Sequence, residues 1–224
     1  MKVFLLLVFL SAASCLRAQP DTTTLLKEVE TRLNAGSHVS QILTEKKYSA
    51  IHPDTRFREL INKNSNDKIL VIAPEDEPGK KIKVIGTVKN GSGQIVADAL
   101  VYLYQTDSRG WYSADAPHVQ MYEGDMRHAR LFGYVKTNKQ GQFELHTVKP
   151  SGYPQSDLPA HIHVHVTANG YRAYVNEFLF DDDDRLVGNI RANAQGNDFI
   201  ISKPEKATAP FQQQFSYTIT LAKD

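Results

Sequence analysis

Short runs of alternating apolar and polar residues, separated by turn-forming residues, occupy most of the chain from about residue 68 onward. Such runs predict β-strands, because successive side chains of a strand point to opposite faces. The predicted strands cover residues 68–73, 82–88, 95–104, 132–137, 143–148, 161–167, 171–180, 198–202 and 215–221. Turn signals such as Asn90-Gly91 stand between them. Many short strands with little helix predict a mainly β protein, an antiparallel β-sandwich.

The segment before the strands has helical periodicity instead. The first predicted helix covers residues 22–34, where apolar residues recur every three or four positions. These apolar residues are Leu25, Leu26, Val29 and Leu33. Shorter apolar groups predict helices near 39–43 and 55–62. We therefore expect a helical segment over 19–66 and a β domain over 67–224. The helices could pack on the β domain or form a homodimer interface, and the pattern leaves both open.

The N-terminus has the features of an export signal. Lys2 precedes an apolar run over residues 3–10, and small residues follow it. This arrangement predicts a cleaved signal over residues 1–18 rather than a membrane helix. Cleavage could follow Ala18, or it could precede Cys15, the only cysteine, as in a lipid-anchored lipoprotein. We expect an exported protein that is periplasmic, secreted or lipid-anchored at the cell surface.

Composition narrows the range of partners. The 224 residues are 41% hydrophobic and 23% charged, and their formal net charge is +1. These values are ordinary for a globular protein and give no reason to expect a nucleic-acid partner. No later apolar run is long enough to span a membrane, so we expect no transmembrane span in the mature protein.

The stretch 158–166, Leu-Pro-Ala-His-Ile-His-Val-His-Val, has the clearest chemical signal. On a strand, His161, His163 and His165 project from one face, and neighbouring histidines stand roughly 7 Å apart at the backbone. Two of these imidazoles can converge on one metal ion. A zinc or copper site built from all three histidines is a rival interpretation.

Two tyrosines precede the histidines, Tyr112 after the run 104–111 and Tyr153 within 147–154. A phenol titrates near pH ~10, but a trivalent cation would hold it deprotonated at neutral pH. Two phenolates and one hydroxide balance a +3 charge, and two neutral histidines complete the shell. Because phenolate is a hard ligand, this arithmetic favours Fe(III).

The connection over residues 113–130 interrupts the strand rhythm and has no clear period. Connections of that length inside a compact domain are usually functional or disordered. Its aromatic, histidine and methionine content favours a lid over the site.

The motifs around these residues resemble a known family. They are Val84-Ile-Gly-Thr-Val88, Ala99-Leu-Val-Tyr-Leu-Tyr-Gln-Thr-Asp-Ser-Arg-Gly-Trp-Tyr112, Gly133-Tyr-Val-Lys-Thr-Asn-Lys-Gln-Gly-Gln-Phe143, Lys149-Pro-Ser-Gly-Tyr-Pro154 and Pro159-Ala-His-Ile-His163. Over about residues 68–222 the chain resembles the intradiol ring-cleavage dioxygenases, the family of catechol 1,2- and protocatechuate 3,4-dioxygenases. The resemblance implies a transthyretin-like (prealbumin-like) β-sandwich.

The resemblance also implies a site and a reaction. Tyr112 and His161 would be equatorial ligands of a non-haem Fe(III), and Tyr153 and His163 would be the axial pair. A catechol-type aromatic diol would react with O2 between its two hydroxyl-bearing carbons, giving a cis,cis-muconate-type diacid. Tyr153 would leave the metal when the diol binds and would accept a proton.

The chain departs from the family pattern around this site. Leu158 stands where the family often has an arginine, three residues before the first ligand histidine. Losing one preorganised cation can cost about a hundredfold in rate, and Arg127 or Arg130 could substitute for it. Glu177 stands where a glutamine commonly faces the iron. Trp111 is a further candidate for the substrate pocket.

Two function classes follow. The first is an exported Fe(III) intradiol dioxygenase. The second is a transthyretin-like cell-surface domain that binds metal or aromatic ligands without turnover, and the leucine at position 158 keeps it open. Fold alone does not separate these classes. Iron content, colour and turnover after oxygen is admitted do.

Overall fold

The computed structural model describes residues 21–66, 68–113 and 129–224. The expected export signal with Cys15, most of the expected lid, and Arg127 lie outside these ranges, so those expectations stay predictions. None of the helices within the described ranges combines the length and the apolar character needed to cross a membrane.

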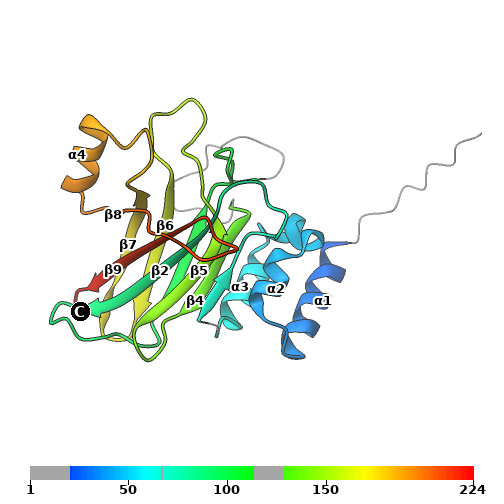
Figure 1. Ribbon diagram of the computed structural model, residues 1–224. Coiled ribbons are helices and arrows are strands. Elements are labelled where there is room, and N and C mark those ends of the chain that lie inside the picture. The colour runs from blue at the N-terminus through cyan, green and yellow to red at the C-terminus, as the bar shows by residue number, and fades with distance from the viewer. Residues whose placement is uncertain (1–20, 67, 114–128) are drawn as a thin grey trace, which may run out of the picture.

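Two β-sheets form the body of the protein (Figure 1). One sheet has the strand order β1-β5-β2-β9 and the other has the order β4-β3-β6-β7-β8. The strands are β1 (Ile69–Val71), β2 (Lys81–Asn90), β3 (Leu100–Gln105), β4 (Leu131–Lys136), β5 (Gln142–Val148), β6 (His161–Ala168), β7 (Tyr171–Phe180), β8 (Ile200–Ser202) and β9 (Gln213–Leu221). The mainly β sandwich predicted from the sequence is confirmed.

Alternation along the strands builds the core between the sheets. In β2 every second residue is buried, and β9, which pairs with it in register, repeats the pattern from Phe215 to Leu221. Phe178 and Phe180 of β7 meet Phe215 edge-on, with ring centroids 6.0 and 4.9 Å apart. Burying each such side chain contributes about 2–3 kcal/mol. The sandwich is therefore held mainly by apolar contact between its sheets.

The sheets are mixed rather than purely antiparallel, which corrects the prediction. β1 pairs with β5, β2 with β9 and β7 with β8 in parallel. Periodicity reveals which residues alternate between faces but carries no information on strand direction. The predicted strand 95–104 begins only at Leu100, because Asp98 has a positive φ of 57° that breaks the extended chain.

The N-terminal segment forms three α-helices and one 3-10 helix. They are α1 (Thr22–Asn34), α2 (Val39–Thr44), η1 (Lys46–Ile51) and α3 (Thr55–Lys63). The helix predicted over 22–34 is confirmed, and its four apolar residues are buried. Figure 1 shows the helices beside β1 and β4, and their buried residues share one hydrophobic cluster with the strands. The helical segment thus packs on the sandwich, and a homodimer stays a prediction.

Helix α4 (Gly188–Gly196) was not predicted. Its sequence, Gly-Asn-Ile-Arg-Ala-Asn-Ala-Gln-Gly, is rich in glycine and asparagine, which have weak helix propensity. Only Ala194 of this helix is buried, so the sequence has no apolar stripe from which the helix could be predicted.

Arg58 of α3 connects the helical segment to the second sheet. Its side chain donates to the Tyr102 hydroxyl at 2.9 Å, the Ala129 carbonyl at 2.7 Å and the His52 carbonyl at 2.9 Å. Its guanidinium carbon lies 3.7 Å from the centre of the Phe132 ring. Arg58 is only 6% exposed, so the charge depends on these contacts.

Replacing Arg58 by alanine should therefore destabilise the fold. We expect a loss of about 3 kcal/mol, because three buried acceptors lose their donor. Urea unfolding followed by circular dichroism measures it. Arg56→Ala on the same helix is the matched control, since the Arg56 side chain is exposed and bonds only with Asp54 in the described contacts. Equal unfolding midpoints for the two variants would contradict this role of Arg58.

Candidate metal centre

Strand β6 presents its histidines on the face that points away from the sandwich core. Its alternate residues Ile162, Val164 and Val166 are buried in the core. His161 and His163 therefore project outward, as the alternation predicted. Across the sheet, His163 lies between Tyr104 of β3 and Glu177 of β7 in the strand register. The Tyr104 ring stacks on the His163 ring with centroids 4.2 Å apart.

The two tyrosines lie on two loops that are joined by hydrogen bonds from side-chain hydroxyls to backbone carbonyls. Tyr112 follows β3, and Tyr153 lies between β5 and β6. The Thr106 hydroxyl donates to the Ser151 carbonyl at 2.7 Å, and the Ser151 hydroxyl donates to the Ser108 carbonyl at 2.8 Å. These bonds hold both tyrosine loops together at the end of the sheet where β3 ends and β6 begins.

The loops also approach each other at two glycines. Gly110 has φ +82°, and a side chain there would place its Cβ 2.3 Å from the Gly152 carbonyl oxygen. Gly110 is thus required both by its backbone conformation and by the space between the loops. Close backbone packing brings the two phenols together.

Four donor atoms converge at this point. The Tyr112 and Tyr153 hydroxyl oxygens are 2.6 Å apart. Tyr112 Oη lies 2.9 Å from His163 Nε2, and Tyr153 Oη lies 3.1 Å from His161 Nε2. Ligand atoms bonded to one ion at about 2.1 Å stand roughly 3 Å apart where their bonds meet at right angles. The four side chains therefore have the spacing that one metal ion requires.

The environment explains why a cation suits these donors. Burial raises the pKa of Tyr112 and of Tyr153, and for Tyr112 the neighbouring Tyr153 raises it further. Tyr112 is only 3% exposed. Two phenols at such short range cannot both ionise unless a strong positive charge compensates them. Hard oxygen donors and imidazoles together fit a trivalent ion such as Fe(III).

The remaining predicted residues lie in different settings. Glu177 belongs to the group His161, His163 and Glu177, whose donor atoms lie within 4.8 Å of one another. Leu158 is 50% exposed. Trp111 is half-buried and packs under the Arg109 guanidinium, whose carbon lies 4.0 Å from the ring centre.

The rival site with three histidines is not supported. The only group of three or more histidine, cysteine or carboxylate side chains close enough to hold a metal, in the described ranges, omits His165. Burial lowers the pKa of His165, whose ring instead meets Tyr102 edge-on with centroids 5.9 Å apart.

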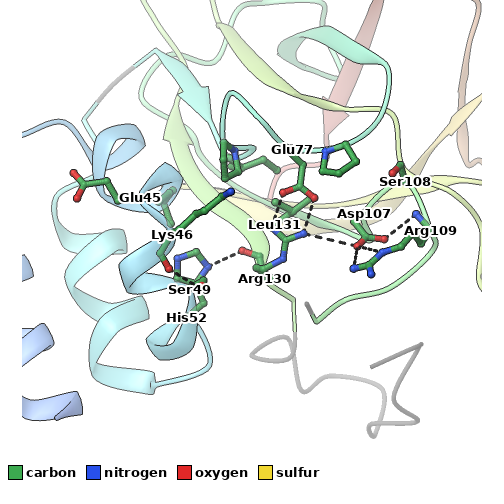
Figure 2. A pocket seen from close by; sticks show the side chains of 14 residues that line it. Glu45, Lys46, Ser49, His52, Glu77, Asp107, Ser108, Arg109, Arg130 and Leu131 are labelled. Carbon is green, nitrogen blue, oxygen red and sulfur yellow. Dashed lines mark hydrogen bonds and ion pairs between the residues drawn. The ribbon is translucent and has the colours of Figure 1, made fainter. Parts of the chain in front are cut away.

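Arg130 does not substitute for the missing cation, which corrects the expectation. Its guanidinium donates to both carboxylate oxygens of Glu77, at 2.6 and 2.8 Å, and lies 3.8 Å from Asp107 (Figure 2). It lines a pocket of about 360 Å³ that includes none of the four convergent side chains. The Arg130 backbone N–H donates to the Tyr112 carbonyl at 2.8 Å, and its carbonyl accepts from His52 Nδ1. Arg130 thus supports the Tyr112 loop and does not face the site.

Two site-supporting residues were missed by the sequence analysis. Asp107 is buried, and its carboxylate accepts from the backbone N–H groups of Arg109 and Trp111, which shapes the turn before Tyr112. Arg185 donates to the carbonyls of Tyr153 and Leu158 at 3.1 and 3.2 Å. The aspartate-glycine spacing could have indicated a turn, whereas nothing near position 185 indicated contact with a distant loop.

The raised phenol pKa values predict a specific alkaline titration of the metal-free protein. Tyr112 should stay protonated when pH passes about 10, where free tyrosines ionise. The ultraviolet absorbance rise through that range should therefore be equal for wild type and Tyr112→Phe. When both proteins are unfolded in urea, the absorbance rise of Tyr112→Phe should be smaller than that of wild type by the amount that one tyrosine contributes. If the folded variant shows this smaller rise as well, Tyr112 ionises normally in the folded protein.

Comparison with known proteins places this geometry in a family. Residues 55–223 match the Dioxygenase_C family, described as "Dioxygenase". The chain is 28% identical over 128 residues to chlorocatechol 1,2-dioxygenase of Rhodococcus opacus, a match that covers 50% of this chain and 48% of that protein. It is 30% identical over 128 residues to catechol 1,2-dioxygenase 1 of Acinetobacter lwoffii, covering 50% of this chain and 39% of that one. The matches thus span about half or less of these relatives' length.

A solved structure supports the fold. The dioxygenase domain of a dioxygenase carbohydrate-binding protein fusion from Streptomyces sp. SirexAA-E superposes with a TM-score of 0.53 at 20% identity, over 71% of this chain and 90% of that one. The family match over residues 55–223, together with the catechol and chlorocatechol 1,2-dioxygenase relatives, shows that the protein belongs to the intradiol ring-cleavage dioxygenase family.

Proposed function

We propose that the protein is a non-haem Fe(III) intradiol dioxygenase acting on a catechol-type aromatic diol. O2 would be incorporated between the two hydroxyl-bearing carbons, and the product would be a cis,cis-muconate-type diacid. The observation that carries this proposal is the convergence of two phenol oxygens and two imidazole nitrogens at 2.6–3.1 Å. The relatives named as catechol and chlorocatechol 1,2-dioxygenases support the substrate class.

Tyr112, Tyr153, His161 and His163 would hold the ion. Bound Fe(III) would supply Lewis acidity that favours the deprotonated diol and draws electron density from its ring. His161 Nδ1 donates to the Pro159 carbonyl at 2.8 Å, which fixes the ring with Nε2 toward the site. The chain thus presents its donors without needing to rearrange them.

Tyr153 is suited to exchange with substrate. It is only partly buried and comes from a loop at the sheet edge, whereas Tyr112 is almost fully buried. When a diol enters, Tyr153 would leave the ion as a phenolate, and its oxygen would take a proton from a substrate hydroxyl to give a neutral phenol and a substrate oxyanion. The Tyr104 ring stacks on the His163 ring and restricts the motion of that imidazole. We assign proton acceptance to Tyr153 and fixed binding to the other three side chains.

The direct test uses purified full-length protein loaded with Fe(III). We expect a visible tyrosinate-to-iron absorption band that shifts when catechol is added under nitrogen. Admitting isotopically labelled O2 should give a diacid that carries both labelled atoms. Iron binding and colour without oxygen consumption would instead support the ligand-binding alternative. Colourless protein that rejects iron would exclude the dioxygenase.

Replacing Tyr153 by phenylalanine should change both colour and turnover. We expect a weaker, shifted absorption band and ring cleavage at least about 100-fold slower, because a metal ligand and a proton acceptor are lost together. Visible spectra and oxygen uptake measure the two effects. Tyr134→Phe, on the same face of the sheet but without contact to the four donors in the described interactions, is the matched control. An unchanged Tyr153→Phe enzyme would remove this tyrosine from the centre.

A further inference from the structure

Glu177 of β7 lies directly opposite His163 of β6 in the antiparallel register. Residues directly opposite in a sheet share a face, so its carboxylate projects toward the four donors. One donor atom each from His161, His163 and Glu177 lies within 4.8 Å of the others. The Glu177 side chain is 31% exposed, which leaves it room to adjust.

The His163 ring is oriented so that its Nδ1 atom faces the Glu177 carboxylate. His163 Nε2 faces Tyr112 Oη at 2.9 Å, and His163 Nδ1 faces Glu177 Oε1 at 3.6 Å. His161 has the same arrangement, with Nε2 toward Tyr153 and Nδ1 bonded to the Pro159 carbonyl. Metal-binding histidines usually donate their second ring N–H to a carboxylate or carbonyl. In both imidazoles Nδ1 thus faces an oxygen acceptor, at hydrogen-bond distance for His161 and at ion-pair distance for His163, and Nε2 faces a tyrosine oxygen at the proposed metal position.

In the part of the chain that the structure describes, the one ion-pair contact of Glu177 is with His163, and no lysine or arginine pairs with it. A carboxylate placed beside two phenolates is unfavourable unless a cation compensates the negative charges.

We propose that Glu177 is a positioning residue of the metal centre, where its carboxylate accepts the Nδ1 hydrogen of His163 and supplies a third negative charge matched to a trivalent ion. Two phenolates and this carboxylate together balance a +3 charge. The inference rests on the proposed iron site and deepens it. A neutral amide at this position would offer an oxygen but no charge, so the carboxylate should favour Fe(III) over Fe(II).

Glu177→Gln tests the charge, because glutamine keeps the oxygen and the length of the side chain. We expect at least about tenfold weaker Fe(III) binding, within the 10–100-fold range for such partners. Competition with nitrilotriacetate measures Fe(III) affinity. If Fe(II) affinity is unchanged, each tenfold loss raises the Fe(III)/Fe(II) potential by about 59 mV, which redox titration measures. Glu177→Ala also removes the acceptor and should weaken both oxidation states.

Glu144→Gln is the matched control. Glu144 pairs with His146 on the other sheet, so this variant removes a carboxylate–histidine contact from a strand that carries none of the four proposed ligands. We expect wild-type iron affinity and potential for it. Wild-type values in Glu177→Gln and Glu177→Ala would overturn the role of Glu177 while leaving the iron site intact. Wild-type protein that binds no Fe(III) would overturn both the role and the proposed function.

Discussion

The convergence of two phenol oxygens and two imidazole nitrogens is the arrangement on which the site depends. Two phenol oxygens stand 2.6 Å apart in a setting that raises the pKa of both, and two imidazole nitrogens and a carboxylate lie close by. Without a metal these atoms hydrogen-bond to one another, which requires that the phenols keep their protons. A small, highly charged cation would bind all four atoms and would stabilise the deprotonated phenols. The arrangement therefore supports the proposed metal centre.

The fold holds these groups in place with separate devices. The outer face of β6 fixes the two histidines, because the alternate side chains of that strand are locked in the core. The tyrosine loops are fastened to each other by Thr106, Ser151 and the close approach at Gly110. Arg130, which joins Glu77 and the Tyr112 carbonyl, braces the first loop from the side of the helical segment. Rigid support of this kind is what the proposed exchange of Tyr153 with substrate would need from the neighbouring residues.

Local patterns in the sequence predicted what local physics determines. The alternation of His161 and His163, the helix over 22–34 and the sandwich all follow from periodicity, and the structure contains them. Contacts between distant segments left no such trace. The parallel pairing of β2 with β9 is of this kind, as are the pairing of Arg130 with Glu77 and the bonds from Arg185 to the Tyr153 loop. Helix α4 was not predicted because its sequence has weak helix propensity and only Ala194 of it is buried.

The most direct test of the central claim is a crystal structure of the iron-loaded protein with anomalous diffraction collected at the iron absorption edge. The account predicts one strong peak within bonding distance of Tyr112 Oη, Tyr153 Oη, His161 Nε2 and His163 Nε2. A peak elsewhere, or a peak bound by the histidines with both tyrosines turned away, would contradict it.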